Sequence, residues 1–377
     1  MMTKDISIKE GVGVDISVSM VLSKFKTALS AMERVVGSRS TLPILNNVLI
    51  KADKNGVELI GTDLEIGIKF FIGGKVDQEG SITIPGKTLI TLVNSLHGET
   101  VVLQGRGNNI EVKCGDIRAT INATPADDYP ILPEVEGGKS VKIGGDKLKQ
   151  MLSAVDFSAS RDESRQLLTG VLVNSKADGL VMAATDSYRL SEVEDKKPLG
   201  EEFKVIIPAK TIVELKRLVK EGDQVEVRVE DSQIMFVMDS VVLVSRLIEG
   251  EYPNYQQIIP TESNISALVD VQELMDAIKS ASVFSVDGGN SIKLVFDSTG
   301  LKVTSEASQV GNFDGSVEAK VEGGSEEVGF NAKYVLDGLA SFDTPKCELK
   351  IGSKTSPVLF TPSGVENRRY IVMPLRG

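Results

Sequence analysis

The stretch GSITIPGKTLITLV, residues 80–93, places Lys87 between a strand-like run and an apolar helical pattern. A lysine at such a junction is typical of a phosphate-binding loop, which needs a glycine, four residues and then Gly-Lys-Ser/Thr. Counting back from Gly86, the required first glycine is replaced by Ser81, and Pro85 has no backbone N–H to offer a phosphate. The spacing therefore argues against a nucleotide-dependent enzyme built on Lys87, which we keep only as the weaker alternative.

Other groups that could carry out catalysis are few. His97 is the single histidine, and Cys114 and Cys347 stand far apart without metal-ligand spacing. The adjacent acids Asp127 and Asp128 lie in the turn-rich PADDYPILP, where solvated carboxylates are more common than a catalytic pair. We therefore expect no catalytic residues, no metal and no cofactor, and the sequence predicts that the protein is not an enzyme.

Length and composition indicate a globular protein of two or three domains, with 377 residues of which 41% are hydrophobic and 25% charged. No apolar run is long enough to span a membrane, and the polar N-terminus lacks the apolar core of a signal peptide. With two isolated cysteines, we expect a reduced chain in the cytoplasm. The net charge of −11 would ordinarily count against a nucleic-acid partner.

The lysine segment belongs to a long internal repeat. GSITIPGKTLITLVNSL is echoed by FKVIIPAKTIVELKRLV and by EEVGFNAKYVLDGLASF. Aligning Pro85, Pro208 and Asn331 gives 208 − 85 = 123 and 331 − 208 = 123. Asp63 and Asp186 keep the same interval, since 186 − 63 = 123. This interval is the size of a domain and much longer than a solenoid repeat, so the chain is predicted to hold three copies of one fold.

Each copy is predicted to be an α+β domain with two helices packed on antiparallel sheets. An amphipathic helix comes first, short alternating strands with turn signals follow, and a second helix begins after the Pro/Asn-x-Lys segment. Pro85 and Pro208 suit the first turn of that second helix, and the first helix of copy three is displaced by a few residues. The predicted domains are 1–133, with a short extension 1–12, then 134–260 and 261–377.

Five segments together resemble the beta subunit of bacterial DNA polymerase III, the beta sliding clamp family. They are STLPILNNVLI, ATDSYRL, EYPNYQQIIP, GFNAKYVLDGL and YIVMPLRG, in the family's order and spacing. The resemblance covers essentially the whole chain. It implies a DNA polymerase processivity factor with the DNA-clamp fold, in which two chains join head to tail as a ring around duplex DNA, with helices lining the hole and sheets outside.

Simple geometry agrees with two chains in such a ring. Helices roughly 10 Å wide, two from each copy, give one chain a lining of about 60 Å and an opening of only about 10 Å. Two chains give about 120 Å and an opening of about 28 Å, enough for a duplex about 20 Å across. Because a ring holds DNA by topology, an acidic protein needs only a modest positive field in the hole.

Basic residues on or beside the helices are the candidates for that lining. The resemblance favours Arg39, Arg165 and Lys210, whereas one family DNA-contact position carries an acid here, Asp162. For each lysine or arginine the plain alternative is an ordinary solvated helix face. The predicted DNA-binding residues are Lys24, Arg39, Lys87, Arg161, Arg165, Lys210, Lys216, Arg217 and Lys333.

The resemblance also implies a peptide-binding pocket between the second and third domains. The DNA polymerase III catalytic subunit, the clamp loader, other polymerases and repair proteins would insert there a short linear motif with aliphatic and aromatic anchors. The plain alternative treats YIVMPL as an edge strand that fills the core. The predicted pocket residues are Leu168, Thr185, Ser187, Tyr188, Arg189, Leu190, Pro253, Ile258, Asn331, Tyr334, Pro357, Ile371, Met373, Pro374, Leu375 and Arg376.

A homodimer contact is implied between the closing strand of the first domain and an edge of the third. Ile121, Val283 and Phe284 match interface positions of the family, and Phe284 is a plausible hot spot. A protein-only scaffold built from the same repeat is the second hypothesis; it would have the same pocket without topological retention on DNA. The leading hypothesis places the protein in the cytoplasm, associated with the nucleoid.

Overall fold

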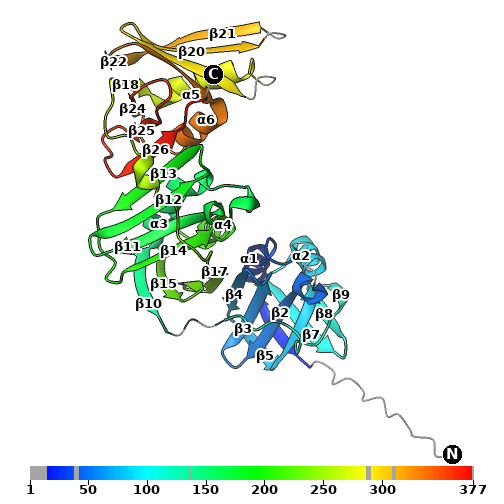
Figure 1. The fold of residues 1–377 in the computed structure, drawn as a ribbon. Helices are drawn as coiled ribbons and strands as arrows, with labels where there is room; N and C mark the ends of the chain where they lie inside the picture. Colours follow the sequence, from blue (N-terminus) through cyan, green and yellow to red (C-terminus); the bar gives the residue numbers. More distant parts are fainter. Residues whose placement is uncertain are drawn as a thin grey trace, which may run out of the picture. The chain divides into compact units, whose positions relative to one another are not determined.

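The computed structural model describes residues 15–37, 42–133, 135, 137–285, 290–307 and 311–375. The chain divides into two compact units. The first unit comprises 1–138 and 223–246, and the second comprises 139–222 and 247–377. Figure 1 colours the chain by sequence, so that each unit can be followed by its labels.

Six α-helices occur in the described part of the chain, two for each copy of the repeat. They are α1 (Leu22–Met32), α2 (Gly86–Ser95), α3 (Gly145–Val155), α4 (Ala209–Leu218), α5 (Val271–Ser282) and α6 (Ala332–Ala340). The starts of α2, α4 and α6 are evenly spaced, since 209 − 86 = 123 and 332 − 209 = 123. The starts of α1 and α3 are also 123 apart, but α5 begins 271 − 145 = 126 residues after α3. The predicted helices and the displacement in copy three are therefore confirmed.

The helix that follows Pro85 starts without a phosphate cradle. Pro85 is the N-cap residue of α2, one position before the first turn where we had placed it, and Pro208 does the same for α4. Gly86 is buried, and a Cβ atom there would lie 2.4 Å from a methyl carbon of Val36. The glycine thus permits close packing of α2, which explains the Pro-Gly-Lys-Thr sequence without a nucleotide.

The first unit contains two antiparallel sheets. One has the order β5-β1-β7-β8-β9, and the other includes the run β15-β16-β17-β4-β3-β2-β6. The strands of the first sheet are β1 (Ser17–Val21), β5 (Gly74–Gln78), β7 (Thr100–Arg106), β8 (Asn109–Cys114) and β9 (Ile117–Asn122). Those of the second are β2 (Asn47–Asp53), β3 (Gly56–Thr62), β4 (Ile66–Ile72), β6 (Gly80–Pro85), β15 (Gln224–Glu230), β16 (Gln233–Met238) and β17 (Val241–Arg246).

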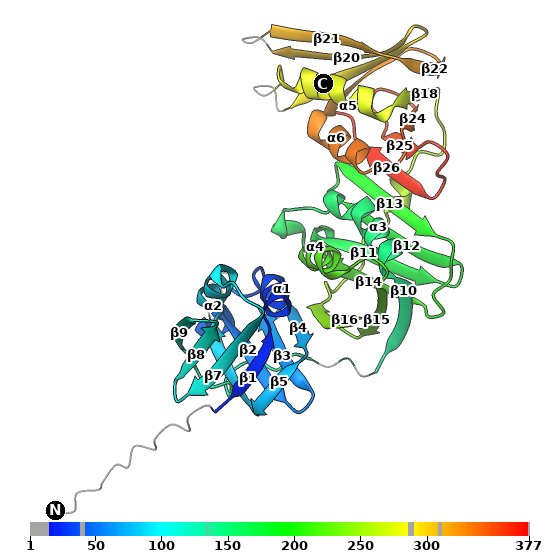
Figure 2. The same ribbon diagram turned by 180° about the vertical axis from the view of Figure 1, so that it is seen from behind.

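Helices α1 and α2 lie side by side over the strands of copy one, as both views show (Figures 1 and 2). Phe25, Leu29 and Met32 recur at helical spacing and are buried on the face of α1 that contacts β3 and β4. Gly61 in β3 allows this approach, because a Cβ atom there would lie 2.9 Å from the sulfur of Met32. The opposite face of α1 carries Lys24 to solvent.

The second unit is built around a long antiparallel sheet with the order β14-β11-β12-β13-β26-β25-β24-β18-β22 and a smaller one with the order β21-β20-β19-β23. The strands of the long sheet are β11 (Gly170–Lys176), β12 (Gly179–Thr185), β13 (Arg189–Asp195), β14 (Phe203–Pro208), β18 (Ile265–Asp270), β22 (Ala319–Gly323), β24 (Lys346–Ile351), β25 (Val358–Pro362) and β26 (Arg368–Val372). Those of the smaller sheet are β19 (Ser291–Asp297), β20 (Gly300–Ala307), β21 (Gly311–Val317) and β23 (Glu326–Asn331). Strand β10 (Lys139–Gly144) also belongs to this unit.

The C-terminal strand β26 is not an edge strand, which corrects the alternative considered for YIVMPL. It lies between β25 and β13, with Leu190 opposite Ile371 and Arg189 opposite Val372. Ile371 and Val372 are both fully buried, so both faces of this strand are covered. Because β13 comes from copy two and β26 from copy three, one continuous sheet joins the two copies.

The backbone of the repeat is reproduced down to a single left-handed residue. Leu64 has φ +75° and Ser187 has φ +77°, at positions that differ by 187 − 64 = 123. In copy one the Thr62 hydroxyl accepts from the N–H of Leu64 (3.0 Å) and donates to the carbonyl four residues on (2.9 Å). The Thr185 hydroxyl makes the same two bonds in copy two, at 3.1 and 2.6 Å. The same turn thus connects β3 to β4 and β12 to β13.

Candidate functional site

The turn between β12 and β13 places Arg189 at the start of β13. One Asp186 oxygen, Oδ1, accepts from the backbone N–H of Tyr188 (2.9 Å) and of Arg189 (3.0 Å). The other, Oδ2, accepts from Nε of the Arg189 side chain at 3.0 Å. Asp186 therefore shapes the turn and holds the guanidinium with the same carboxylate.

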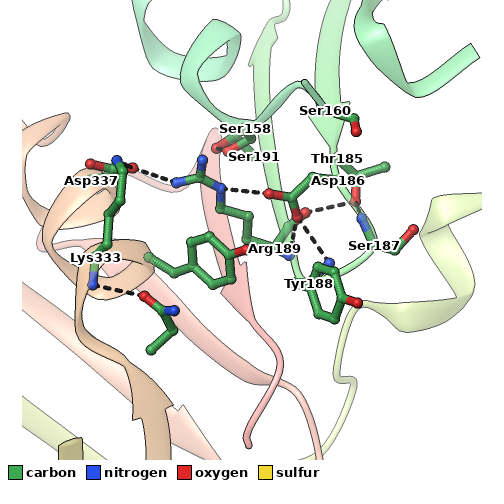
Figure 3. A network of polar contacts seen from close by, with 12 residues as sticks. Ser158, Ser160, Thr185, Asp186, Ser187, Tyr188, Arg189, Ser191, Lys333 and Asp337 are labelled. Atoms are coloured by element: carbon green, nitrogen blue, oxygen red, sulfur yellow. Dashed lines mark hydrogen bonds and ion pairs between the residues drawn. The ribbon is translucent and has the colours of Figure 1, made fainter. Parts of the chain in front are cut away.

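A second carboxylate, from copy three, holds the other side of the guanidinium. Asp337 on α6 accepts from Nη1 of Arg189 at 2.6 Å (Figure 3). Burial by itself would lower the pKa of Arg189, but Tyr370 and the two carboxylates more than offset this, and the pKa is raised. Arg189 is consequently always charged, and its buried side chain links copies two and three through an ion pair.

Aromatic rings cover the guanidinium of Arg189. Its central carbon, Cζ, lies 4.6 Å from the ring centre of Tyr334 and 5.7 Å from that of Phe157. Tyr334 in turn stacks on Tyr188, with 6.3 Å between ring centres and 21° between planes. The Tyr188 side chain is 56% exposed. Arg189, Tyr334 and Tyr188 are thus stacked in this order from the interior to the surface, and the exposed ring of Tyr188 can contact a ligand.

Helix α6 is fixed against the sheet by Tyr370 of β26. The Tyr370 hydroxyl donates to the carbonyl oxygen of Tyr334 at 2.6 Å. Gly338 makes room for the ring, because a Cβ atom there would lie 2.0 Å from it. Asn331 caps the helix, its side chain accepting from the N–H of Lys333 at 3.0 Å. Together these contacts set the position of Tyr334 relative to Arg189.

The segment after β26 runs along the same turn. The N–H of Met373 donates to the carbonyl oxygen of Tyr188 at 2.8 Å, and the N–H of Leu375 donates to that of Gly329 at 2.8 Å. Met373 and Pro374 are half-buried and the Leu375 side chain is 42% exposed. This part of the chain therefore offers apolar side chains to solvent beside Tyr188.

Several predicted pocket residues belong to a separate buried apolar cluster. Leu168, Leu190 and Ile371 belong to it, and the Tyr252 hydroxyl accepts from the N–H of Thr185 at 3.1 Å. Other members of this cluster were not identified from the sequence. The repeat could have pointed to some of them, because Leu49, Ile60 and Tyr129 form the matching cluster of copy one. The missed members are Leu172, Ala183, Ile206, Tyr252, Tyr255 and Leu359.

The structure connects eight of the sixteen predicted pocket residues by direct contacts, and the role of all sixteen in binding a peptide stays a prediction. Thr185, Ser187, Tyr188, Arg189, Leu190, Tyr334, Ile371 and Met373 are connected by the contacts above. Pro253 and Ile258 are exposed and Pro357 is half-buried; their part in a pocket stays a prediction. Arg376 lies outside the described residues. Asp337 and Phe157, which contact Arg189, were not identified from the sequence.

Six of the predicted DNA-facing residues are exposed on or beside the helices, including Arg217 on α4 and Lys333 on α6. Lys24 is on α1, Lys87 on α2 and Lys210 on α4, while Arg161 precedes the 3₁₀ turn Glu163–Thr169. Lys87, Lys210 and Lys333 each stand one residue after the start of a second helix. Arg39 lies outside the described residues, so its predicted position stays untested.

Four of the predicted DNA-facing cations are engaged in ion pairs within the second unit. Each pair joins two side chains, with nitrogen–oxygen distances between 2.5 and 3.2 Å. They are Arg165 with Asp162, Lys216 with Asp156, Arg217 with Glu214 and Lys333 with Asp337. A DNA phosphate would have to compete with these carboxylates, most directly at the partly buried Lys216.

The acid at a family DNA-contact position, Asp162, has a structural role here. Its side chain accepts from the N–H of Ser164 (3.1 Å) and from the Ser164 hydroxyl (2.7 Å), capping the 3₁₀ turn. These two hydrogen bonds lower the pKa of Asp162, and Arg165 adds to the effect. The same carboxylate draws the Arg165 side chain toward it.

The predicted dimer residues differ in how much surface they offer. Val283 is 63% exposed, and Phe284 is half-buried with its ring stacked on Phe313 of β21, 6.3 Å between centres. Ile121 on β9 is buried within its own unit. Ile117 on the same strand is 44% exposed and was not identified from the sequence.

Within the described residues, no group of His, Cys, Asp and Glu side chains could hold a metal ion, and no helix is long and apolar enough to cross a membrane. What the structure does present is a helix pair on antiparallel sheet that recurs along the chain, with cations on the helices and an aromatic surface where copies two and three meet. This architecture defines the class of DNA-clamp proteins.

Family models for the DNA polymerase III beta subunit match the chain in three parts: the N-terminal domain at residues 17–133, the central domain at 142–254 and the C-terminal domain at 256–376. The chain therefore belongs to the DNA polymerase III beta subunit family. The function that goes with this family is that of a DNA polymerase processivity factor, a sliding clamp.

Individual sliding clamps are similar to this chain in sequence and in structure. The beta sliding clamp of Synechocystis is 33% identical over 381 residues, which covers 94% of this chain and 97% of the relative. The sliding clamp of Bacillus subtilis superposes with a TM-score of 0.92 at 26% identity, covering 96% of this chain and all of that one. A Pseudomonas aeruginosa sliding clamp bound to griselimycin has the same TM-score, identity and coverage.

Proposed function

We propose that two copies of this chain close head to tail into a ring that encircles duplex DNA and carries bound polymerase along it. The repeat supports this, because three helix pairs per chain give twelve helices for a dimer, enough for an opening of about 28 Å. Clamps of this family are processivity factors rather than catalysts, and we propose that this chain catalyses no reaction and acts at the nucleoid in the cytoplasm.

Two edge strands support the closure of the ring. Strand β9 ends one sheet of the first unit, and β21 ends the smaller sheet of the second unit. Backbone N–H and C=O groups along one side of each edge can pair with another chain. Val283 and the stacked Phe284 and Phe313 lie beside β21 or on it. We propose that β9 of one chain pairs with β21 of the next, with these apolar side chains packed beside the new strand pair.

Retention on DNA of defined topology tests the ring. A labelled clamp is loaded onto a nicked circular plasmid by a bacterial clamp loader, and the free protein is removed by gel filtration. The clamp should remain on the circle and leave within minutes once a restriction enzyme linearises it. Equal loss from circle and linear DNA would contradict the ring and favour a scaffold that binds only proteins.

The salt dependence of DNA binding tests the cations. Lys24→Glu should reduce the slope of log affinity for a short duplex against log salt by about 1, because one phosphate contact is lost. Lys54, an exposed lysine in the β2–β3 turn, provides the control, and Lys54→Glu should leave the slope unchanged. The nucleotide alternative for Lys87 predicts a thermal shift with ATP that Lys87→Ala removes; no shift is expected.

We further propose that the surface around Tyr188, Tyr334, Met373 and Leu375 binds short peptide motifs. The partners would be the DNA polymerase III catalytic subunit, the clamp loader, other polymerases and repair proteins. The support is that the exposed Tyr188 ring, stacked on Tyr334, lies beside the partly exposed Met373 and Leu375. Aromatic walls with an adaptable methionine suit a site that accepts several related motifs.

A further inference from the structure

One carboxylate oxygen lies between the proposed DNA-facing side and the proposed peptide surface. Oδ2 of Asp337 accepts from Nη1 of Arg189 at 2.6 Å and from Nζ of Lys333 at 2.5 Å (Figure 3). Lys333 lies four residues before Asp337 on α6. The two cations therefore share the same acceptor atom, although each is assigned to a different ligand.

The two cations are unequally accessible. The Lys333 side chain is 57% exposed, whereas the side chain of Arg189 is 9% exposed. Lys333 can therefore turn toward a phosphate in solvent, and Arg189 cannot. If the two hydrogen bonds to Asp337 change in strength, the change must therefore start with movement of the Lys333 side chain.

On the peptide side, Asp337 is one of the two carboxylates that hold Arg189 under the ring of Tyr334. Tyr334 stacks on the exposed Tyr188. A firmer bond between Arg189 and Asp337 thus limits the motion of both rings before a peptide arrives. A surface ordered in advance loses less side-chain entropy on binding and has a higher affinity.

A second cation from the DNA-facing set touches the same turn. Nη1 of Arg165 donates to the carbonyl oxygen of Asp186 at 3.3 Å and to the Ser187 hydroxyl at 3.1 Å. Asp186 is the other carboxylate that holds Arg189. One side of the guanidinium is thus connected to Lys333 through the Asp337 carboxylate. The other side is bonded by the carboxylate of Asp186, whose backbone carbonyl accepts from Arg165.

We propose that Asp337 is a positioning residue that couples DNA in the ring to peptide affinity, an inference that rests on the proposed function. A duplex phosphate attracts the Lys333 ammonium group away from Asp337. Oδ2 of Asp337 then accepts a hydrogen bond from Arg189 alone. The Asp337–Arg189 bond then strengthens and holds Tyr334 and Tyr188 in place. The clamp on DNA binds its peptide partners more tightly than the free clamp, and by linkage a bound peptide raises affinity for DNA by the same factor.

The test measures the affinity of a fluorescein-labelled peptide with leucine and phenylalanine anchors, by anisotropy, with and without a saturating short duplex at low salt. For the unaltered dimer we expect the duplex to tighten peptide binding about two- to fivefold, the range for partly exposed ion pairs. Lys333→Ala should already show the tighter affinity without duplex and gain nothing from it. Asp337→Asn should bind the peptide more weakly and be indifferent to duplex, and Asp337→Glu should restore part of the dependence.

Lys87 provides the matched control, because it occupies the position of Lys333 in copy one. Lys87→Ala should weaken duplex binding yet keep the full gain in peptide affinity once the duplex is saturating. If peptide and duplex both bind but neither affects the other, or if the duplex weakens peptide binding, the coupling is wrong and the proposed function stands. If the peptide does not bind at all, the peptide site itself is wrong.

Discussion

The guanidinium of Arg189 lies 4.6 Å from the ring centre of Tyr334, and the two residues come from different copies of the repeat. Sequence separation between them is large, but β13 and β26 are neighbours in one sheet and α6 packs against that sheet. The contact is therefore fixed by the pairing of strands from copies two and three. The proposed peptide surface should therefore be sensitive to substitutions in either copy.

Replacing Arg189 should affect both stability and peptide binding. Arg189→Ala leaves the Asp186 and Asp337 carboxylates without their shared partner, which should cost about 2 kcal/mol of unfolding free energy. Peptide affinity should fall at least about tenfold, because Tyr334 loses the charge that it covers. Urea denaturation and peptide anisotropy measure the two effects. Arg189→Lys keeps the charge without the planar fork and should give intermediate values; equal values for lysine and arginine would contradict the stacking argument.

Truncating the C-terminal apolar side chains should affect peptide binding alone. Met373→Ala combined with Leu375→Ala removes partly exposed side chains, so the free energy of unfolding should fall by less than about 1 kcal/mol. Loss of two apolar anchors should weaken the peptide by about tenfold or more. Light scattering should show an intact dimer. Unchanged peptide affinity would contradict the assignment of these residues to the site.

A charge beside β21 should separate the two chains. Val283 is 63% exposed in the isolated chain, so Val283→Asp should fold normally while placing a carboxylate in an apolar contact. We expect the dimer dissociation constant to rise by about 100-fold, as for a central interface residue. Light scattering over a dilution series measures it. Val213→Asp, at a 39% exposed valine on α4, provides the matched control, and equal dissociation of both variants would exclude a specific role for Val283.

The thiol of Cys347 should make stability depend on pH. The side chain is fully buried in β24, and burial, with Asp270 adding to it, raises the pKa of Cys347 to about 12. In the unfolded chain a cysteine ionises near its ordinary pKa of about 8.5. The stabilising contribution is therefore complete below about pH 8.5 and is lost as pH rises toward 12.

Between pH 8.5 and 9.5, below the range where tyrosines ionise, the free energy of unfolding should fall by about 1 kcal/mol because of this residue. Urea denaturation at several pH values measures the slope. Cys347→Ala should be less stable near pH 7, where the contribution of the thiol is complete, and its stability should decline less steeply as pH rises. In the native protein at pH 8 the thiol should not react with Ellman's reagent, and rapid reaction without unfolding would contradict its burial.

The sequence predicted the repeat well because the backbone is conserved where side chains differ. The interval of 123 residues located the starts of α2, α4 and α6 and paired the turns at Leu64 and Ser187. It could not predict which copies share a sheet. Strand β26 has an apolar pattern that suits an edge or an interior position, and only the pairing with β13 decides between them.

The site was predicted less completely, for a physical reason. Resemblance identified Arg189 and Tyr334, but Asp337 looks like an ordinary helix acid four residues after Lys333 and forming a surface ion pair with it. Its second bond, to Arg189, depends on the distance between α6 and the turn of copy two. Such a bond between distant segments has no signature in local spacing.

The interior position of β26 also has a consequence for synthesis of the protein. Arg189 and Tyr188 belong to copy two, but their partners Tyr334, Asp337 and Met373 belong to copy three and are therefore translated later. Because chains fold from the N-terminus as they emerge, the proposed peptide surface can form only after copy three has been synthesised. A growing chain that still lacks α6 and β26 should therefore not bind the proposed partner peptides.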